Sequence, residues 1–173
     1  MKYIVAFAAL FFLAILGASV MPYVKVLGVT PDLVLIFTAC WALLRGQGEA
    51  MVLVPMAGFL RDLTTSDPLG TSVLALSPIL LLASAAREFR MVETDFVPAL
   101  VVVAAGTLAY SLISMTVLII TGQEIPWLTA LLYVALPSAI VNALFTPIVY
   151  LPVRWLSLDL RPPGSRLGPS IPT

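Results

Sequence analysis

The chain has 173 residues, of which 61% are hydrophobic, and it carries nine basic and nine acidic residues for a net charge of zero. Soluble domains usually contain about 25% charged residues, so this composition excludes a soluble globular protein and indicates an all-α integral membrane protein. Because a membrane-spanning helix needs about 20 apolar residues, the length allows five or six spans and no separate extramembrane domain.

Missing side chains exclude several functions. The sequence has no His, which is the commonest general base and the commonest metal ligand. Its one cysteine, Cys40, cannot form an internal disulfide or a thiolate metal cage, so no metal and no cofactor is expected. No basic run occurs, so the electrostatic footprint of a nucleic-acid-binding protein is missing. The partners are therefore expected in the bilayer.

The first predicted span covers residues 3–21, an uncharged segment that follows Lys2. It has 19 residues, whereas the apolar core of a signal peptide usually has about 7–15. The length favours a retained helix over a cleaved signal peptide.

The next two spans are predicted from two short apolar runs, residues 33–44 and 50–60, on either side of a turn at residues 45–49 that is rich in glycine and charge. Neither run can span alone. Extension away from the turn gives spans over residues 27–44 and 49–65, and it brings Asp32, Arg61 and Asp62 into the membrane. The alternative is a re-entrant hairpin, which would leave four spans.

Three more spans follow. A type I turn is expected over residues 66–70, with Gly70 at its fourth position. The later spans cover residues 69–86, with Pro78 inside, residues 96–121 and residues 127–153. The six helices form a predicted transmembrane domain over residues 1–153. Residues 154–173 contain four prolines and are predicted to be a disordered cytoplasmic tail.

The distribution of basic residues predicts the orientation. Six spans place both termini on one side of the membrane, and the positive-inside rule expects the basic residues on the cytoplasmic side. Seven of the nine Lys and Arg residues fall on the side of the termini, against Lys25 and Arg61 on the other, so both termini are predicted to be cytoplasmic. The four-span alternative moves Arg45 and gives six against three.

Ionisable residues inside spans are costly and are functional candidates. Asp32 lies 13 residues before Arg45, and Asp62 lies 13 residues after Glu49, so an antiparallel hairpin places both carboxylates at one depth. Arg61 can then pair with Asp32 or extend to water. One interpretation is a cluster that binds a cation, a substrate or a partner, or performs acid-base chemistry. The favoured interpretation is a structural pair at the helix ends.

Asn142 is a further candidate, near the middle of the sixth span between Pro137 and Pro147. It can satisfy a backbone group freed by a proline or bond to a neighbouring helix, and helix packing is favoured over ligand contact. The Ser, Thr and Asn residues of the last two spans are interpreted as too scattered for a channel.

An enzyme is not expected. A rhomboid-like serine protease is not expected, because the chain has no His to act as the general base. The local sequence Gly58-Phe-Leu-Arg-Asp62 also differs from the Gly-x-Gly-Asp expected of an intramembrane aspartyl protease. Polar residues that could line a ligand pocket are few. A membrane scaffold is therefore the leading function, and a transporter subunit that binds a substrate is the second.

Several short motifs together resemble the MreD family of rod shape-determining membrane proteins: Pro31-Asp32-Leu33, Trp41-Ala42-Leu43, Gly58-Phe-Leu-Arg-Asp62, Pro68-Leu-Gly70, Asn142 and Pro147. Arg61 departs from the pattern, because an apolar residue is expected beside the family's Asp. The match covers most of the chain and depends chiefly on residues 31–76.

The resemblance implies a non-enzymatic component of the bacterial cell-elongation complex in the cytoplasmic membrane. Its implied direct partner is MreC, a single-span membrane protein. The implied wider partners are the MreB cytoskeleton and the peptidoglycan synthase pair of RodA and a class B penicillin-binding protein. The family's fold is similar to the substrate-binding subunits of energy-coupling-factor vitamin transporters, which supplies the alternative function.

Overall fold

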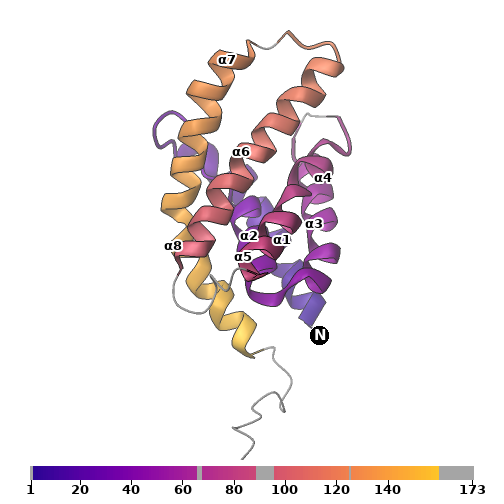
Figure 1. Cartoon of the computed structure of the whole chain (residues 1–173), viewed down its shortest axis with the longest axis vertical. Coiled ribbons are helices and arrows are strands. Elements are labelled where there is room, and N and C mark those ends of the chain that lie inside the picture. Colours follow the sequence, from indigo (N-terminus) through magenta and orange to yellow (C-terminus); the bar gives the residue numbers. More distant parts are fainter. Residues whose placement is uncertain (1, 66–67, 89–95, 125, 160–173) are drawn as a thin grey trace, which may run out of the picture.

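The computed structural model describes residues 2–65, 68–88, 96–124 and 126–159, and within these ranges it is helical, with no strand beyond an isolated bridge between Val26 and Val29. The elements are α1 (Lys2–Ser19), η1 (Met21–Tyr23), α2 (Leu33–Arg45), α3 (Gln47–Asp62), α4 (Thr71–Leu76), α5 (Pro78–Glu88), α6 (Val97–Ile120), α7 (Trp127–Ala130), the π-helical η3 (Leu131–Ala135) and α8 (Leu136–Asp159). Successive helices run back and forth along one bundle (Figure 1).

Two arginines connect helix ends at one end of the bundle. Arg45 donates a hydrogen bond to the carbonyl oxygen of Ser157 on α8, at 3.1 Å. Arg87, near the end of α5, donates to the carbonyl oxygen of Leu43, at 2.7 Å. The turn between α2 and α3 therefore lies level with the ends of α5 and α8, and the start of α1 lies at this end too (Figure 1). We call it the basic end, and the other, where residues 20–32 connect α1 to α2, the Arg61 end.

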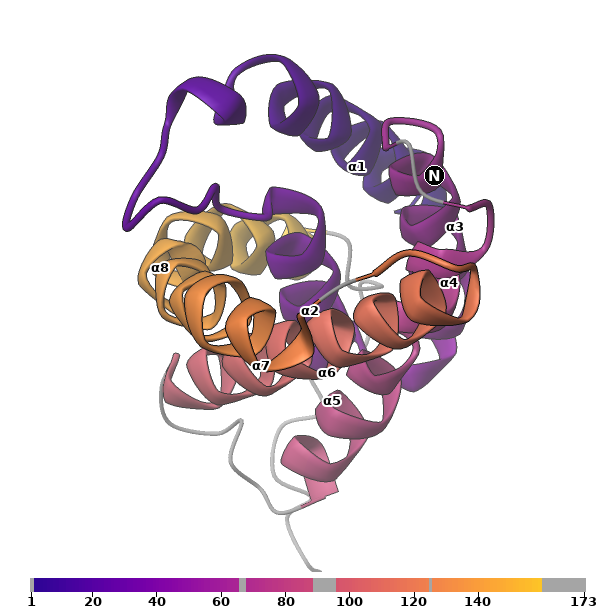
Figure 2. The same cartoon turned by 90° about the horizontal axis from the view of Figure 1, so that it is seen from above.

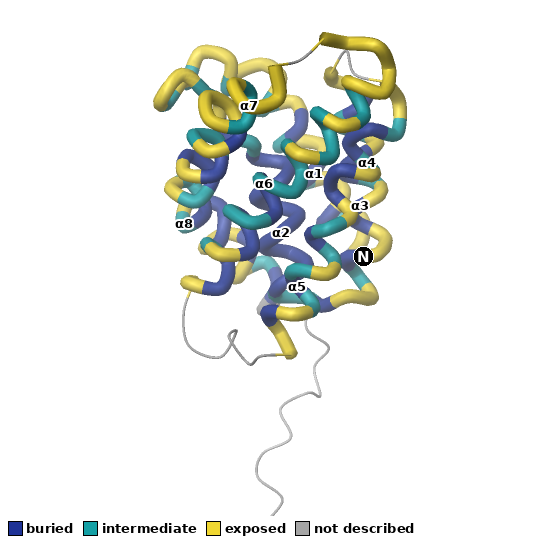
Figure 3. The backbone as a smooth tube through the Cα atoms, turned by 45° about the horizontal axis from the view of Figure 1, so that its top comes forward, coloured by how far each residue is buried: buried dark blue, intermediate teal, exposed yellow. Residues whose placement is uncertain are grey.

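Helix α2 is the centre of the bundle. Its sequence is apolar on every face, as is typical of a helix with no exposed side, and all residues from Leu33 to Leu43 are buried. It packs against α1, α3, α5, α6 and α8, which surround it when the bundle is viewed along its length (Figure 2). The tube coloured by burial shows the same arrangement, with α2 dark inside and exposed positions outside (Figure 3).

The prediction of six helices of full spanning length is met by only four segments of the described chain: Tyr3–Tyr23, Thr71–Glu88, Val97–Ile120 and Trp127–Ser157. Helix α2 has 13 residues and α3 has 16, fewer than the predicted spans 27–44 and 49–65. The lost residues are at the Arg61 end. There Leu27 and Gly28 have positive φ, Asp32 caps α2, and α3 stops at Asp62.

Other boundaries follow proline and glycine. The predicted span 69–86 is divided into α4 and α5 just before Pro78, which begins α5. Gly70 has φ +94° and caps α4, whereas part of its predicted turn, residues 66–67, lies outside the described residues. Helix α8 continues to Asp159, beyond the predicted end of the domain at residue 153. The predicted disordered tail is described only as far as this helix, and residues 160–173 lie outside the described residues.

Candidate functional site: a polar network at the Arg61 end

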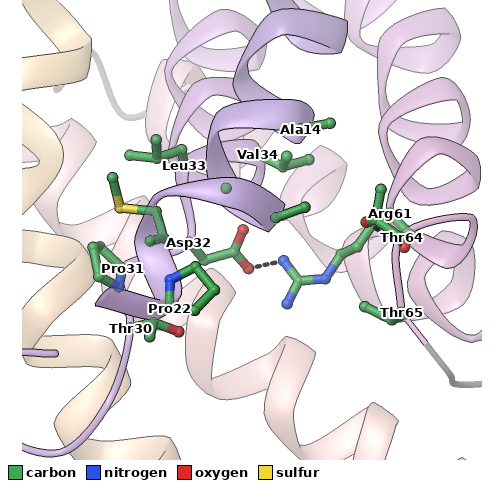
Figure 4. A pocket seen from close by; sticks show the side chains of 13 residues that line it. Ala14, Pro22, Thr30, Pro31, Asp32, Leu33, Val34, Arg61, Thr64 and Thr65 are labelled. Atoms are coloured by element: carbon green, nitrogen blue, oxygen red, sulfur yellow. Dashed lines mark hydrogen bonds and ion pairs between the residues drawn. The ribbon is translucent and has the colours of Figure 1, made fainter. Parts of the chain in front are cut away.

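Asp32 and Arg61 form an ion pair between the start of α2 and the end of α3 (Figure 4). Asp32 is the N-cap of α2, where its Oδ1 accepts a hydrogen bond from the backbone N–H of Leu35 at 3.1 Å. Its Oδ2 pairs with Nη1 of Arg61. The two side chains are only 14% and 22% exposed. Of the two alternatives that the sequence left open for Arg61, the structure has the pair with Asp32 rather than extension to water.

Arg61 also lies over an aromatic ring. Its guanidinium carbon is 4.4 Å from the centre of the Tyr110 ring on α6, which is a cation–π geometry. The Tyr110 hydroxyl is 3.1 Å from the Ser72 hydroxyl on α4. The cation is therefore enclosed by a carboxylate on one side and an aromatic face on another, and it connects α3 to α2 and α6.

Asp62 does not join the Asp32–Arg61 pair, so the three ionisable residues do not form the single cluster that was one interpretation of their positions. It is buried, and its carboxylate accepts from the backbone N–H of Gly70 at 2.6 Å and of Ser72 at 2.9 Å. These N–H groups lie at the start of α4, where no other residue of the helix supplies a partner. Asp62 therefore holds α4 against α3, and Ser72 and Tyr110 connect its carboxylate to the Arg61 side chain.

Asn142 connects α8 to two other helices. Its Oδ1 accepts from the backbone N–H of Asp32 at 2.8 Å, and its Nδ2 donates to Oγ1 of Thr107 at 3.1 Å. The side chain is 1% exposed. Asn142 thus makes the interhelical contacts expected of a packing residue, and its neighbour in the network is the helix cap Asp32.

Gly58 allows α3 and α4 to approach closely. A Cβ atom at this position would lie 2.5 Å from Cα and 2.6 Å from N of Val73, closer than real Cβ contacts come. Because those atoms are backbone, only movement of a helix could relieve the overlap. The Gly58 motif therefore sets the spacing that lets Asp62 reach the start of α4.

Sequence reasoning missed Thr107, Tyr110 and Ser111 on α6. These residues are uncharged and lie in a long apolar segment, so hydropathy does not reveal them. Their spacing of three and four residues places them on one helix face, and Ser138 and Asn142 on α8 repeat a spacing of four. The interpretation of the Ser, Thr and Asn residues of these helices as too scattered for a channel did not anticipate that the two helices bring several of them together.

Two cavities adjoin the ion pair. One, of about 320 Å³, lies between α1, the start of α2 and the end of α3, and Figure 4 shows it with Asp32 and Arg61 in its wall. The other, of about 380 Å³, lies between residues 28–30, α6, η3 and α8, and it is lined by Asp32, Arg61, Tyr110 and Asn142 among others. No group of three or more His, Cys, Asp or Glu side chains that could hold a metal occurs among the described residues.

The comparisons with known proteins identify a family. The family model described as "rod shape-determining protein MreD" matches residues 1–158. Neither the curated proteins nor the solved structures gave a match.

Proposed function

The chain belongs to the MreD family of rod shape-determining membrane proteins, and we propose that it is a non-enzymatic scaffold that binds a single-span membrane protein of the MreC type. Through that partner it would act with the MreB cytoskeleton and with RodA and a class B penicillin-binding protein. The cell-elongation complex and the control of peptidoglycan synthesis belong to the same proposal, as does its place in the bacterial cytoplasmic membrane.

The observation that carries the scaffold function is an apolar groove between α1 and α8. It has a volume of about 390 Å³ and is lined only by apolar side chains from α1, η1, α2 and α8. Phe12 on α1 and Ile148 on α8 line it and are 62% and 65% exposed. Helix α1 packs mainly on α2 and α3, so the groove beside α8 is left without a covering helix among the described residues. A partner helix would bury these side chains by van der Waals packing.

The proposed topology has six passes, with both termini cytoplasmic. Helices α2 and α3 are short, but the turn between them lies level with the ends of α5 and α8, which favours a complete crossing over a re-entrant hairpin. A short helix at the centre of a bundle is acceptable because neighbouring helices, rather than lipid, surround its ends. Arg45 and Arg87 then lie on the cytoplasmic side, as the positive-inside rule requires.

Site-directed cross-linking tests the scaffold proposal. Single cysteines at Phe12 and Ile148 are expected to form cross-links with a cysteine series along the transmembrane helix of a co-expressed MreC-type partner, with a period of three to four residues. Leu81→Cys is the matched control, because Leu81 on α5 is 72% exposed but does not line the groove. Equal cross-linking at all three positions, or none in the groove, would contradict the proposed interface.

The second candidate, a substrate-binding subunit of an energy-coupling-factor-type transporter, is favoured by the polar cavity of about 380 Å³ at one end of the bundle. Such a subunit should retain a vitamin-like small molecule at near one-to-one occupancy through purification. Native mass spectrometry of the purified chain distinguishes the two functions. The transporter function predicts the added mass of a vitamin-like molecule, whereas the scaffold function predicts that this mass is missing and that a co-expressed MreC-type partner stays bound.

A further inference from the structure

The cavity between α6, η3 and α8 is unusually polar for this chain. Nine of the twelve residues that line it have polar side chains, although the chain as a whole is 61% hydrophobic. It reaches from the Arg61 ion pair to Tyr133, which is 73% exposed at the end of the bundle. Its volume of about 380 Å³ is in the range of small-molecule sites, roughly 300–1,000 Å³.

The unused hydrogen-bonding groups of the cavity are N–H groups of Arg61 and several hydroxyls, all of which can donate. Arg61 has five N–H donors; its Nη1 donates to Asp32, and its Nε is buried without a partner. The hydroxyls of Thr30, Ser111, Tyr133 and Ser138 also line the cavity, and none forms a hydrogen bond with another described residue. A guanidinium beside several hydroxyls supplies the charge and the donors that an anion with several acceptor oxygens requires.

Asp32, the one carboxylate that lines the cavity, does not serve as the acceptor for these unused donors. Both oxygens of Asp32 are already engaged, Oδ1 by the N–H of Leu35 and Oδ2 by Arg61. Asp32 therefore holds the guanidinium in place. A planar guanidinium held in this way matches the oxygen atoms of a phosphate, and neighbouring hydroxyls can bond the remaining oxygens.

We propose that this cavity binds a phosphate group, with Arg61 as its charge partner and the hydroxyls of Ser111, Tyr133 and Ser138 as neutral donors. The phosphate belongs either to a lipid headgroup or to a soluble phosphate ester. Trp127 and Tyr133 are exposed at this end of the bundle, as is typical of aromatic residues at headgroup depth. The proposal goes beyond the scaffold function and does not depend on it.

The test measures thermal unfolding of the full chain in a neutral maltoside detergent while a probe is titrated. The probes are dihexanoylphosphatidylglycerol, glycerol 3-phosphate and, as the phosphate-free control, dihexanoylglycerol. A group that binds the folded state raises the midpoint temperature in a saturable manner. We expect a saturable rise with a phosphate-bearing probe and none with dihexanoylglycerol. A rise with the lipid alone assigns a headgroup, and a rise with both phosphate probes assigns the phosphate ester itself.

Two hydroxyl deletions make the test specific. Tyr133→Phe and Ser138→Ala remove donors that have no partner among the described residues, so the basal midpoint temperature should not change. Each should raise the half-saturating probe concentration about tenfold, because a hydrogen bond to a charged group is lost. Tyr23→Phe is the matched control, since Tyr23 is 88% exposed and does not line the cavity.

Two results would overturn the proposal: no saturable rise with any phosphate-bearing probe, or titrations of Tyr133→Phe and Ser138→Ala that match the wild type. Cross-linking to the MreC-type partner in the same variants keeps the two proposals separate. It should be unchanged, because the apolar groove shares neither residue with the cavity.

Discussion

The Asp32–Arg61 ion pair can be tested by a double-mutant cycle that separates pairing from helix capping. Asp32→Asn removes the charge but keeps a side chain that caps a helix as well as Asp does. Asp32→Ala removes both the charge and the hydrogen bond from the N–H of Leu35. Arg61→Met keeps the length of the side chain and removes its charge. The cycle combines Asp32→Asn with Arg61→Met.

The burial of the pair sets the expected magnitude. Loss of one partner costs about 3–5 kcal/mol for a fully buried ion pair and about 0–1 kcal/mol for an exposed one. At 14% and 22% exposure, with cavities on two sides, we expect a loss of about 2–3 kcal/mol for each single change. The double variant should lose about 2 kcal/mol less than the sum. Asp32→Ala should cost about 1 kcal/mol more than Asp32→Asn.

The free energy of unfolding can be measured by titrating the full chain in mixed micelles with a denaturing detergent. Lys25→Met is the matched control, because it removes an exposed positive charge from the same end of the bundle and should change stability by less than about 0.5 kcal/mol. Strictly additive losses in the cycle would refute the reasoning. So would a gain in stability from Arg61→Met alone, because the unpaired Asp32 should then carry a cost.

Three further predictions concern other parts of the fold. Gly58→Ala should destabilise the chain by about 1–3 kcal/mol in the same titration, because the added Cβ overlaps the backbone of α4, whereas Gly48→Ala, with open space around it, should be neutral or stabilising. Asp62→Asn should cost about 1–3 kcal/mol, because the buried N–H groups at the start of α4 lose a charged acceptor, and amide hydrogen exchange should rise in α4 before it rises in α6. Cysteines at Lys2 and Ser170 should resist impermeant reagents in intact cells, and strong labelling of either would contradict the proposed topology.

The sequence predicted what hydropathy and turn chemistry determine. The glycine-rich turn between α2 and α3 is a local property of the chain, and the structure has it, with Gly46 at positive φ. The pairing of Asp32 with Arg61 could be considered from the sequence as one alternative. A short turn between two antiparallel helices determines which residues of the two helices lie at the same depth in the membrane.

The contacts of Asp62, the polar face of α6 and the ends of α2 and α3 could not be predicted from hydropathy. Asp62 caps a helix that begins nine residues later, and nothing in its own charge distinguishes a capping carboxylate from a partner for Arg61. Tyr110 and Thr107 lie in an uncharged segment, and only their helical spacing indicates a polar face. The predicted ends of α2 and α3 at the Arg61 end were wrong for a related reason. An apolar run indicates how far a helix can extend, but it does not show where a capping residue such as Asp32 ends the helix.

The short central helix has a consequence for the electric barrier that the protein presents. Helix α2 has 13 residues, a rise of about 20 Å, whereas the hydrocarbon layer is about 30 Å thick. One end of α2 lies level with the ends of α5 and α8, so in the proposed topology the shortfall of about 10 Å falls above Asp32. Asp32 and Arg61 line two cavities at this end of the bundle. In that topology the guanidinium of Arg61 lies about a third of the way through the insulating layer, where the transmembrane potential acts on its charge.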